Sequence, residues 1–111
     1  MNVPEHLDDQ GRRKWAEVLP VLQAHGDADQ GTLDALAAYC SAWSRWTGAE
    51  AKVTEQGAVV DGTANPYIAI AGAAQRQLRQ WSGELKLTPK TRGRAERGES
   101  AVMELLRNPA A

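Results

Sequence analysis

Apolar side chains recur at steps of three and four residues in the first half of the chain, the spacing of one face of a helix. The first such stretch covers residues 15–22 and follows the capping pair Asp8-Asp9, so a helix is predicted to run to about His25. A second helix is predicted over about Asp29–Glu55. Because a glycine separates the two, we expect them to form an antiparallel helical hairpin.

A third long helix is predicted to begin at Asn65-Pro66. Asparagine is a good N-cap, and proline suits the first helical position because a helix leaves that N–H unpaired. A seam of apolar and small side chains then recurs at helical steps, which predicts burial against another helix. Its members are Tyr67, Ala71, Ala74, Leu78, Trp81 and Leu85. Thr88-Pro89 repeats the cap and proline, so a second short helix is predicted there.

A short β-hairpin is predicted between the second and third helices. The stretch Gly57–Gly62 places two valines before an Asp-Gly turn, a pair typical of tight hairpins. A two-stranded ribbon is marginal in water, so it needs support from a helix or from a neighbouring subunit. The fold class is therefore mainly α, with one small ribbon.

The second helix carries more aromatic surface than packing on one partner requires. Tyr39, Trp43 and Trp46 trace a second stripe beside its main apolar stripe. With Val59 and Val60 of the hairpin they are predicted to form an oligomer interface, where tryptophan and tyrosine are enriched. The alternative is that the third helix covers this stripe within one subunit.

Composition indicates one soluble domain. The chain has 111 residues, 42% hydrophobic and 24% charged, enough for a modest core. No apolar run approaches the roughly 20 residues of a membrane span, and no leader is evident, so a cytosolic protein without a membrane partner is expected. The single cysteine, Cys40, excludes an intramolecular disulfide and a cysteine-based metal cluster.

Charge is divided unevenly along the chain. Residues 1–65 carry 5 Lys/Arg against 10 Asp/Glu, whereas residues 66–111 carry 8 against 4. The net charges of −5 and +4 suggest a polyanion partner for the basic half or a head-to-tail contact between subunits. Solvated helix surfaces are the alternative that charge counting leaves open.

The basic half is the predicted site of DNA binding, because phosphate neutralisation requires several cations within a short span. The candidate residues are Arg76, Arg79, Lys86, Lys90, Arg92, Arg94 and Arg97. Residues 1–98 are expected to form a helical DNA-binding and oligomerisation domain. Residues 99–111 form a short tail whose apolar positions 102–106 either dock on the body or bind a partner.

Catalytic chemistry is not predicted. No phosphate-cradling glycine pattern occurs, and His6 and His25 lack partners at metal-ligand spacing. Cys40 falls mid-helix on an apolar stripe, where a buried structural thiol is favoured over a nucleophile. We therefore expect a protein that is not an enzyme, with no catalytic residues, no metal and no cofactor.

Several motifs in this order resemble the small terminase subunit of tailed bacteriophages, in the group that serves HK97-like prophages. They are Trp15, Asp29, Leu33, Leu36-Ala37-Ala38-Tyr39-Cys40, Trp43, Gly57, Gly62, Asn65-Pro66 and Leu85-Lys86-Leu87-Thr88-Pro89-Lys90-Thr91-Arg92. The resemblance covers roughly residues 4–94, and Leu-Thr-Pro-x-x-Arg is its most specific part. Lys86 departs from the family pattern, which has glycine before Leu-Thr-Pro.

The resemblance implies a helical subunit that assembles into a ring of about eight to ten copies in the host cytoplasm. Such rings bind the packaging site on double-stranded viral DNA and deliver it to the large terminase subunit, which holds the ATPase and nuclease. The tail would then be a docking peptide for that subunit. Two other classes stay open: a stand-alone helical DNA-binding regulator and a protein-binding helical adaptor.

Overall fold

The computed structural model describes residues 2–87 of the chain. In chain order its elements are α1 (Asp9–Ala24), α2 (Gln30–Gln56), β1 (Val59–Val60), β2 (Thr63–Ala64) and α3 (Pro66–Glu84). The mainly helical fold with one β-hairpin between the second and third helices is therefore confirmed. The predicted short helix at Thr88-Pro89 and the tail over 99–111 lie outside the described residues.

Each helix begins at a side chain that caps it. The Asp8 carboxylate accepts from the Gly11 N–H at 2.9 Å, and the Asp29 carboxylate accepts from the Thr32 N–H at 2.8 Å. These bonds satisfy N–H groups that the first turn leaves unpaired. The Thr32 backbone N–H is the main cause that holds the pKa of Asp29 below its ordinary value.

α1 and α3 end in the same way, with one residue in the left-handed conformation after the last turn. After α1 this residue is Gly26, at φ +72°, and the chain reverses there into α2. After α3 it is Lys86, at φ +57°. The Leu87 N–H then bonds back to the Ser82 carbonyl at 2.9 Å. A lysine thus occupies a position whose backbone conformation favours glycine.

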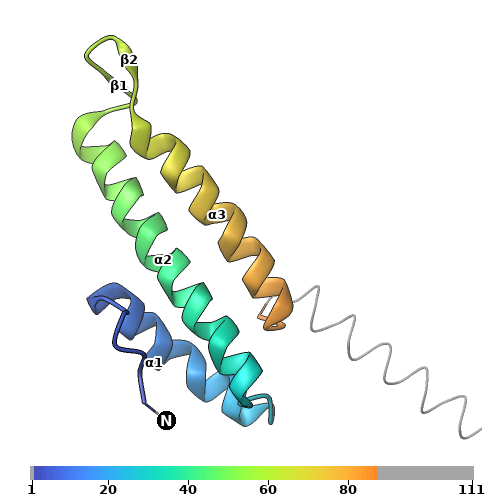
Figure 1. The fold of residues 1–111 in the computed structure, drawn as a ribbon. Helices are drawn as coiled ribbons and strands as arrows, with labels where there is room; N and C mark the ends of the chain where they lie inside the picture. The colour runs from blue at the N-terminus through green and yellow to red at the C-terminus, as the bar shows by residue number, and fades with distance from the viewer. Residues whose placement is uncertain (1, 88–111) are drawn as a thin grey trace, which may run out of the picture.

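α2 is the central element of the fold. α3 runs antiparallel to α2 along most of its length, and α1 packs against the first half of α2 (Figure 1). The Asp8 carboxylate accepts a hydrogen bond from the Ser44 hydroxyl, so α1 begins beside the middle of α2. Beyond that level the subunit is a two-helix arm that ends in the β-hairpin.

The hydrophobic core lies where all three helices meet. Leu36 and Cys40 of α2 are fully buried, between Trp15 and Leu22 of α1 and Leu78 of α3. Along the arm the contact becomes narrower and is made largely by small residues. Ala49 of α2 is buried there, and so are Ala71 and Ala74 of α3. The predicted seam is thus confirmed at Ala71, Ala74, Leu78 and Leu85, and Trp81 packs against the core.

Asn65 ties the β-hairpin to the ends of α2 and α3. Its side chain is 1% exposed, accepts from the Tyr67 N–H at 3.0 Å, and donates to the Gly57 carbonyl at 2.9 Å. Its backbone N–H donates to the Ala58 carbonyl at 2.9 Å. The hairpin pairs Val60 with Thr63 across the predicted Asp-Gly turn. One buried amide therefore serves as both the cap of α3 and the base of the hairpin.

We predict that Asn65→Ala lowers the free energy of unfolding by about 2 kcal/mol, because the helix cap is removed and the Gly57 carbonyl is left without its donor. Asn65→Asp is the matched control, since it keeps the acceptor for the Tyr67 N–H but cannot donate to Gly57. It is expected to remain less stable than the parent protein in urea unfolding followed by circular dichroism at one protein concentration. Equal stability of Asn65→Asp and the parent would show that the Gly57 bond contributes nothing.

Candidate nucleic-acid interface

Three of the predicted DNA-binding cations lie among the described residues. Arg76 and Arg79 are exposed on α3, and Lys86 is exposed just after it. None of the three forms a salt bridge within residues 2–87, where the ion pairs are Lys14–Glu17 and Lys52–Glu55. Lys90, Arg92, Arg94 and Arg97 lie outside the described residues. The structure therefore provides two exposed arginines in the second half of α3, and an exposed lysine after it, directly before the most basic part of the sequence.

Arg45 joins these cations from the acidic half of the chain. It is exposed on α2, and its Nη2 donates to Gln77 Oε1 on α3 at 2.7 Å. Counting charges along the sequence misses this residue, because it lies far from the basic run. The antiparallel register of α2 and α3 is the signal that places it beside Gln77 of α3.

Other cations near the start of α1 are engaged inside the subunit. Lys14 Nζ lies 3.8 Å from the centroid of the Trp43 ring and 3.2 Å from Glu17 Oε2. Arg12 Nε donates to the Leu7 carbonyl at 3.0 Å. A cation over an indole face is stabilised by the ring quadrupole, so Lys14 contributes to packing of α1 on α2.

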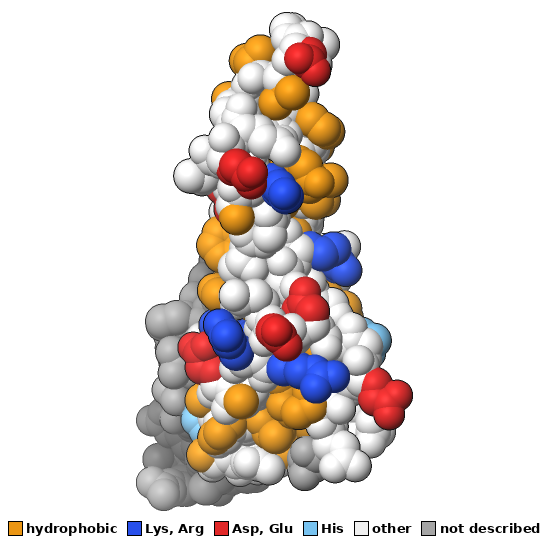
Figure 2. All heavy atoms as spheres, turned by 90° about the vertical axis from the view of Figure 1, so that its left-hand side faces the viewer, with side chains coloured by type: hydrophobic (Ala, Val, Ile, Leu, Met, Phe, Trp, Pro, Cys, Tyr) orange, Lys and Arg blue, Asp and Glu red, His pale blue; other side chains and the backbone are white. Residues whose placement is uncertain are grey.

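The face formed by α1 and α2 shows no large area of one charge. In Figure 2 acidic and basic side chains are interspersed over it, and apolar side chains follow one edge of its upper part. Exposed large apolar residues at this end of the molecule are Val59, Ile68 and Ile70, at 66%, 42% and 44% exposure. Among the described residues, three of the five exposed large apolar side chains therefore lie on the arm, and the other two, Val3 and Val21, lie at the three-helix end.

The predicted oligomer-interface residues fall in two places. Tyr39 is buried in the core of the subunit itself. Trp43 and Trp46 are half-buried against that core, with their rings edge to face at a centroid distance of 5.4 Å. Val59 and Val60 lie at the tip of the arm, and Val59 is open to solvent. An interface role for these residues stays a prediction.

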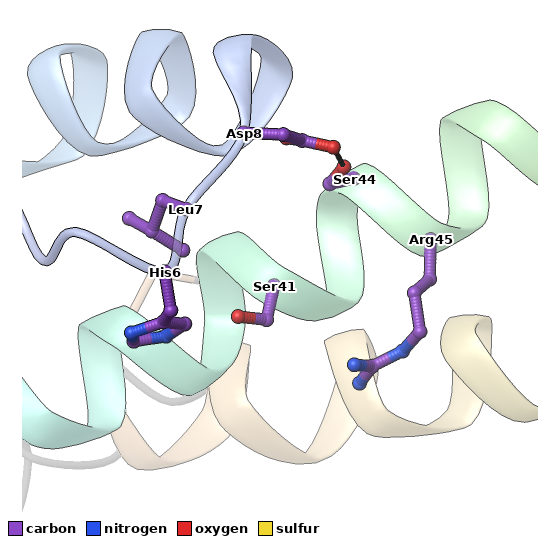
Figure 3. Close-up of a pocket in the computed structure, with 6 residues that line it drawn as sticks. All are labelled: His6, Leu7, Asp8, Ser41, Ser44 and Arg45. Atoms are coloured by element: carbon purple, nitrogen blue, oxygen red, sulfur yellow. Dashed lines mark hydrogen bonds between the residues drawn. The ribbon is translucent and has the colours of Figure 1, made fainter.

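A small hollow lies where the chain enters α1 beside α2. It has a volume of about 180 Å³ and is lined by His6, Leu7, Asp8, Ser41, Ser44 and Arg45. Figure 3 shows Asp8 and Ser44 joined across one side of the hollow, while the Arg45 guanidinium extends toward α3. The Ser44 hydroxyl is the main cause that holds the pKa of Asp8 below its ordinary value. An ionised carboxylate thus lies at the edge of this hollow.

Metal-ligand clusters and a reactive thiol are two kinds of site that the described residues do not form. Within residues 2–87 no three histidine, cysteine or acidic side chains come together as metal ligands. Burial raises the pKa of the Cys40 thiol to about 12, so the thiolate that a nucleophile needs is not formed at neutral pH. Within the same part of the chain no helix has both the length and the apolar content needed to cross a membrane.

A comparison with protein-family models gives a match over residues 11–101, to the family described as phage terminase, small subunit. The chain belongs to this family. No curated protein and no solved structure matches it. The narrower resemblance to the HK97-like group stays a prediction.

The family match covers the part of the chain that carries the exposed cations of α3. The matched stretch of this terminase small subunit begins in the first turn of α1 and includes all three helices and the basic run that follows them. A terminase small subunit role is therefore supported by the whole helical body of the chain, and not by one motif.

The burial of the Cys40 thiol can be tested by its reactivity. Cys40 is expected to react with an aromatic disulfide reagent at pH 8 at least a hundredfold more slowly in the folded protein than in urea. Its folded pKa lies above the ordinary 9.0, so its contribution to stability is complete below pH 9 and is lost as the pH rises toward 12. Equal reaction rates with and without urea would contradict the burial of this residue.

Proposed function

We propose that this terminase small subunit is the DNA-recognition component of a phage packaging machine and acts in the host cytoplasm. Many copies assemble into a ring of about eight to ten subunits, bind the packaging site on double-stranded viral DNA, and deliver it to the large terminase subunit. The small subunit carries out no catalysis and acts on the ATPase and nuclease of its partner. Residues 99–111 serve as the segment that docks on that partner.

The observation that supports DNA binding most strongly is the free basic side of α3. Arg79 and Lys86 are exposed and form no ion pair within the described residues, and four more cations follow by residue 97. Cations that are not engaged with carboxylates are available to neutralise phosphates. One subunit offers few such contacts, but a ring presents them in many copies at a high effective concentration.

The candidate interface does not resemble a helix placed in the major groove. The tight turn between α1 and α2 is followed by Asp27, Asp29 and Asp34, which would repel phosphate at the start of the second helix. The basic residues instead continue past the end of α3 into a stretch with Gly93 and Gly98. This arrangement favours contacts along the DNA backbone.

We predict that binding to duplex DNA, measured by fluorescence anisotropy, weakens steeply as salt rises. The triple variant Arg92→Gln, Arg94→Gln, Arg97→Gln should reduce affinity at least tenfold and flatten the plot of log affinity against log salt, by roughly 0.9 for each phosphate that the variant no longer neutralises. Assembly should remain intact. Arg13→Gln on α1 is the matched control for removal of an exposed arginine and should change neither quantity.

Two outcomes would favour the other classes. Affinity that does not change with salt, or no binding at low salt, would indicate a protein-binding adaptor. Salt-dependent binding by a dimer would indicate a stand-alone regulator. If the triple variant instead fails to assemble, these arginines belong to a subunit contact.

A further inference from the structure

The first half of α3 is apolar on all sides, although α2 covers one side of it. Between Pro66 and Ala74 there is no charged side chain, and the one polar group is the Tyr67 hydroxyl. Ala71 and Ala74 face α2 and are buried, whereas Ile68, Ala69, Ile70 and Ala73 are exposed. A helix that is apolar all round is typical of a helix covered on all sides. α1 does not cover it, because α1 reaches only to the level of Ser44.

α2 has an exposed glycine, Gly48, where another helix can approach closely. Gly48 lies in the middle of this 27-residue helix, where glycine costs roughly 1 kcal/mol relative to alanine. A side chain added at Gly48 would meet no atom within 4 Å, so packing inside the subunit does not require glycine there. Close approach of another helix is the usual reason for such a residue.

The two surfaces lie at the same height on the arm. The bond between Arg45 and Gln77 fixes the register of α2 and α3. Gly48 is one turn beyond Arg45, and Ala73 is one turn before Gln77 on the antiparallel helix, so both lie the same distance from that bond. Both are exposed, and neither belongs to the buried seam between the helices.

Charge supports the same pairing. When Ala73 of one copy is placed against Gly48 of a parallel copy, Arg76 lies one turn below Ala73 and Ser44 lies one turn below Gly48. Arg76 of the first copy then faces the hollow of the second, where Asp8 is held ionised by its bond to Ser44. Arg45 lines the same hollow, but its guanidinium is bound to Gln77 (Figure 3).

From these observations we infer that the outer side of α3, at Ala69, Ala73 and Arg76, packs against α2 of a second copy at Gly48, with Arg76 beside Asp8. The contact is head to tail, because it joins two different surfaces of the same chain. Repeated with rotation it closes into a ring. It rests on the proposed ring assembly, and it assigns Arg76 to the subunit contact and leaves Arg79 and the cations after it for DNA.

The test is a cysteine pair in the full-length protein, Gly48→Cys with Ala73→Cys, after mild oxidation and denaturing electrophoresis without reductant. The natural Cys40 is buried and does not interfere. The double variant should form a ladder of covalent oligomers, and each single variant should migrate as the monomer. A ladder of covalent oligomers can arise only from disulfides between copies.

Three results would overturn the contact, and light scattering on the same samples separates them from failure of the proposed function. A ring in solution without a ladder would disprove this contact and leave ring assembly standing. Covalent dimers of either single variant would show a like-with-like contact. A parent protein that stays monomeric would disprove ring assembly and this contact together.

Two further pairs of variants extend the test where introduced cysteines impair assembly. Gly48→Leu should block the ring and leave a folded subunit by circular dichroism, whereas Ala16→Leu, at an exposed position on α1, should assemble normally. Arg76→Glu should shift the ring to smaller species, whereas Arg79→Glu should keep the ring and weaken DNA binding. The reverse pattern for the two arginines, or a ring formed by Gly48→Leu, would contradict the inference.

Discussion

The fold depends on the burial of one long helix between two others. Leu36, Cys40 and Ala42 of α2 are fully excluded from solvent, and α1 and α3 each pack mainly on α2. Burial of a side chain such as Leu36 contributes about 2 kcal/mol, so a few residues at this crossing supply much of the stability of a small chain. Because α1 is shorter than α2, the same packing leaves half of α2 and α3 with one partner each.

That difference in length divides the subunit into two parts. The three-helix end has large core side chains and an aromatic edge stabilised by Lys14 over Trp43. The arm has alanines at its seam and exposed isoleucines and valine around it. Asn65 fixes the far end by polar bonds in place of a core. A subunit built in this way is stable at one end and has apolar surface available for another molecule at the other.

Much of the fold could be predicted from local chemistry. Asp8, Asp29 and Asn65 mark all three helix starts, and the Asp61-Gly62 turn marks the hairpin, because capping and positive φ depend on neighbouring residues alone. What a stripe of side chains packs against depends on the lengths of other helices, so sequence could not decide whether Tyr39 faces its own subunit. The contact of Arg45 with α3 and the bond of Asp8 to Ser44 join residues more than 30 positions apart, and the sequence pattern does not reveal such pairs.

The role proposed for the basic residues in DNA binding depends on assembly. One copy has a net charge of −1, whereas the proposed ring would bring many copies of the basic residues together, where their effects on a polyanion would add. The proposed assembly would also bury the apolar half of α3. In this account DNA binding and burial of the arm depend on the same association.

Native mass spectrometry of the full-length protein over a range of concentrations tests this account most directly. The account predicts one closed species of about eight to ten copies of the 12.0 kDa chain at micromolar concentration, with little intermediate mass. A monomer that persists at all concentrations would contradict it, because the apolar half of α3 would then be stable in water without a partner.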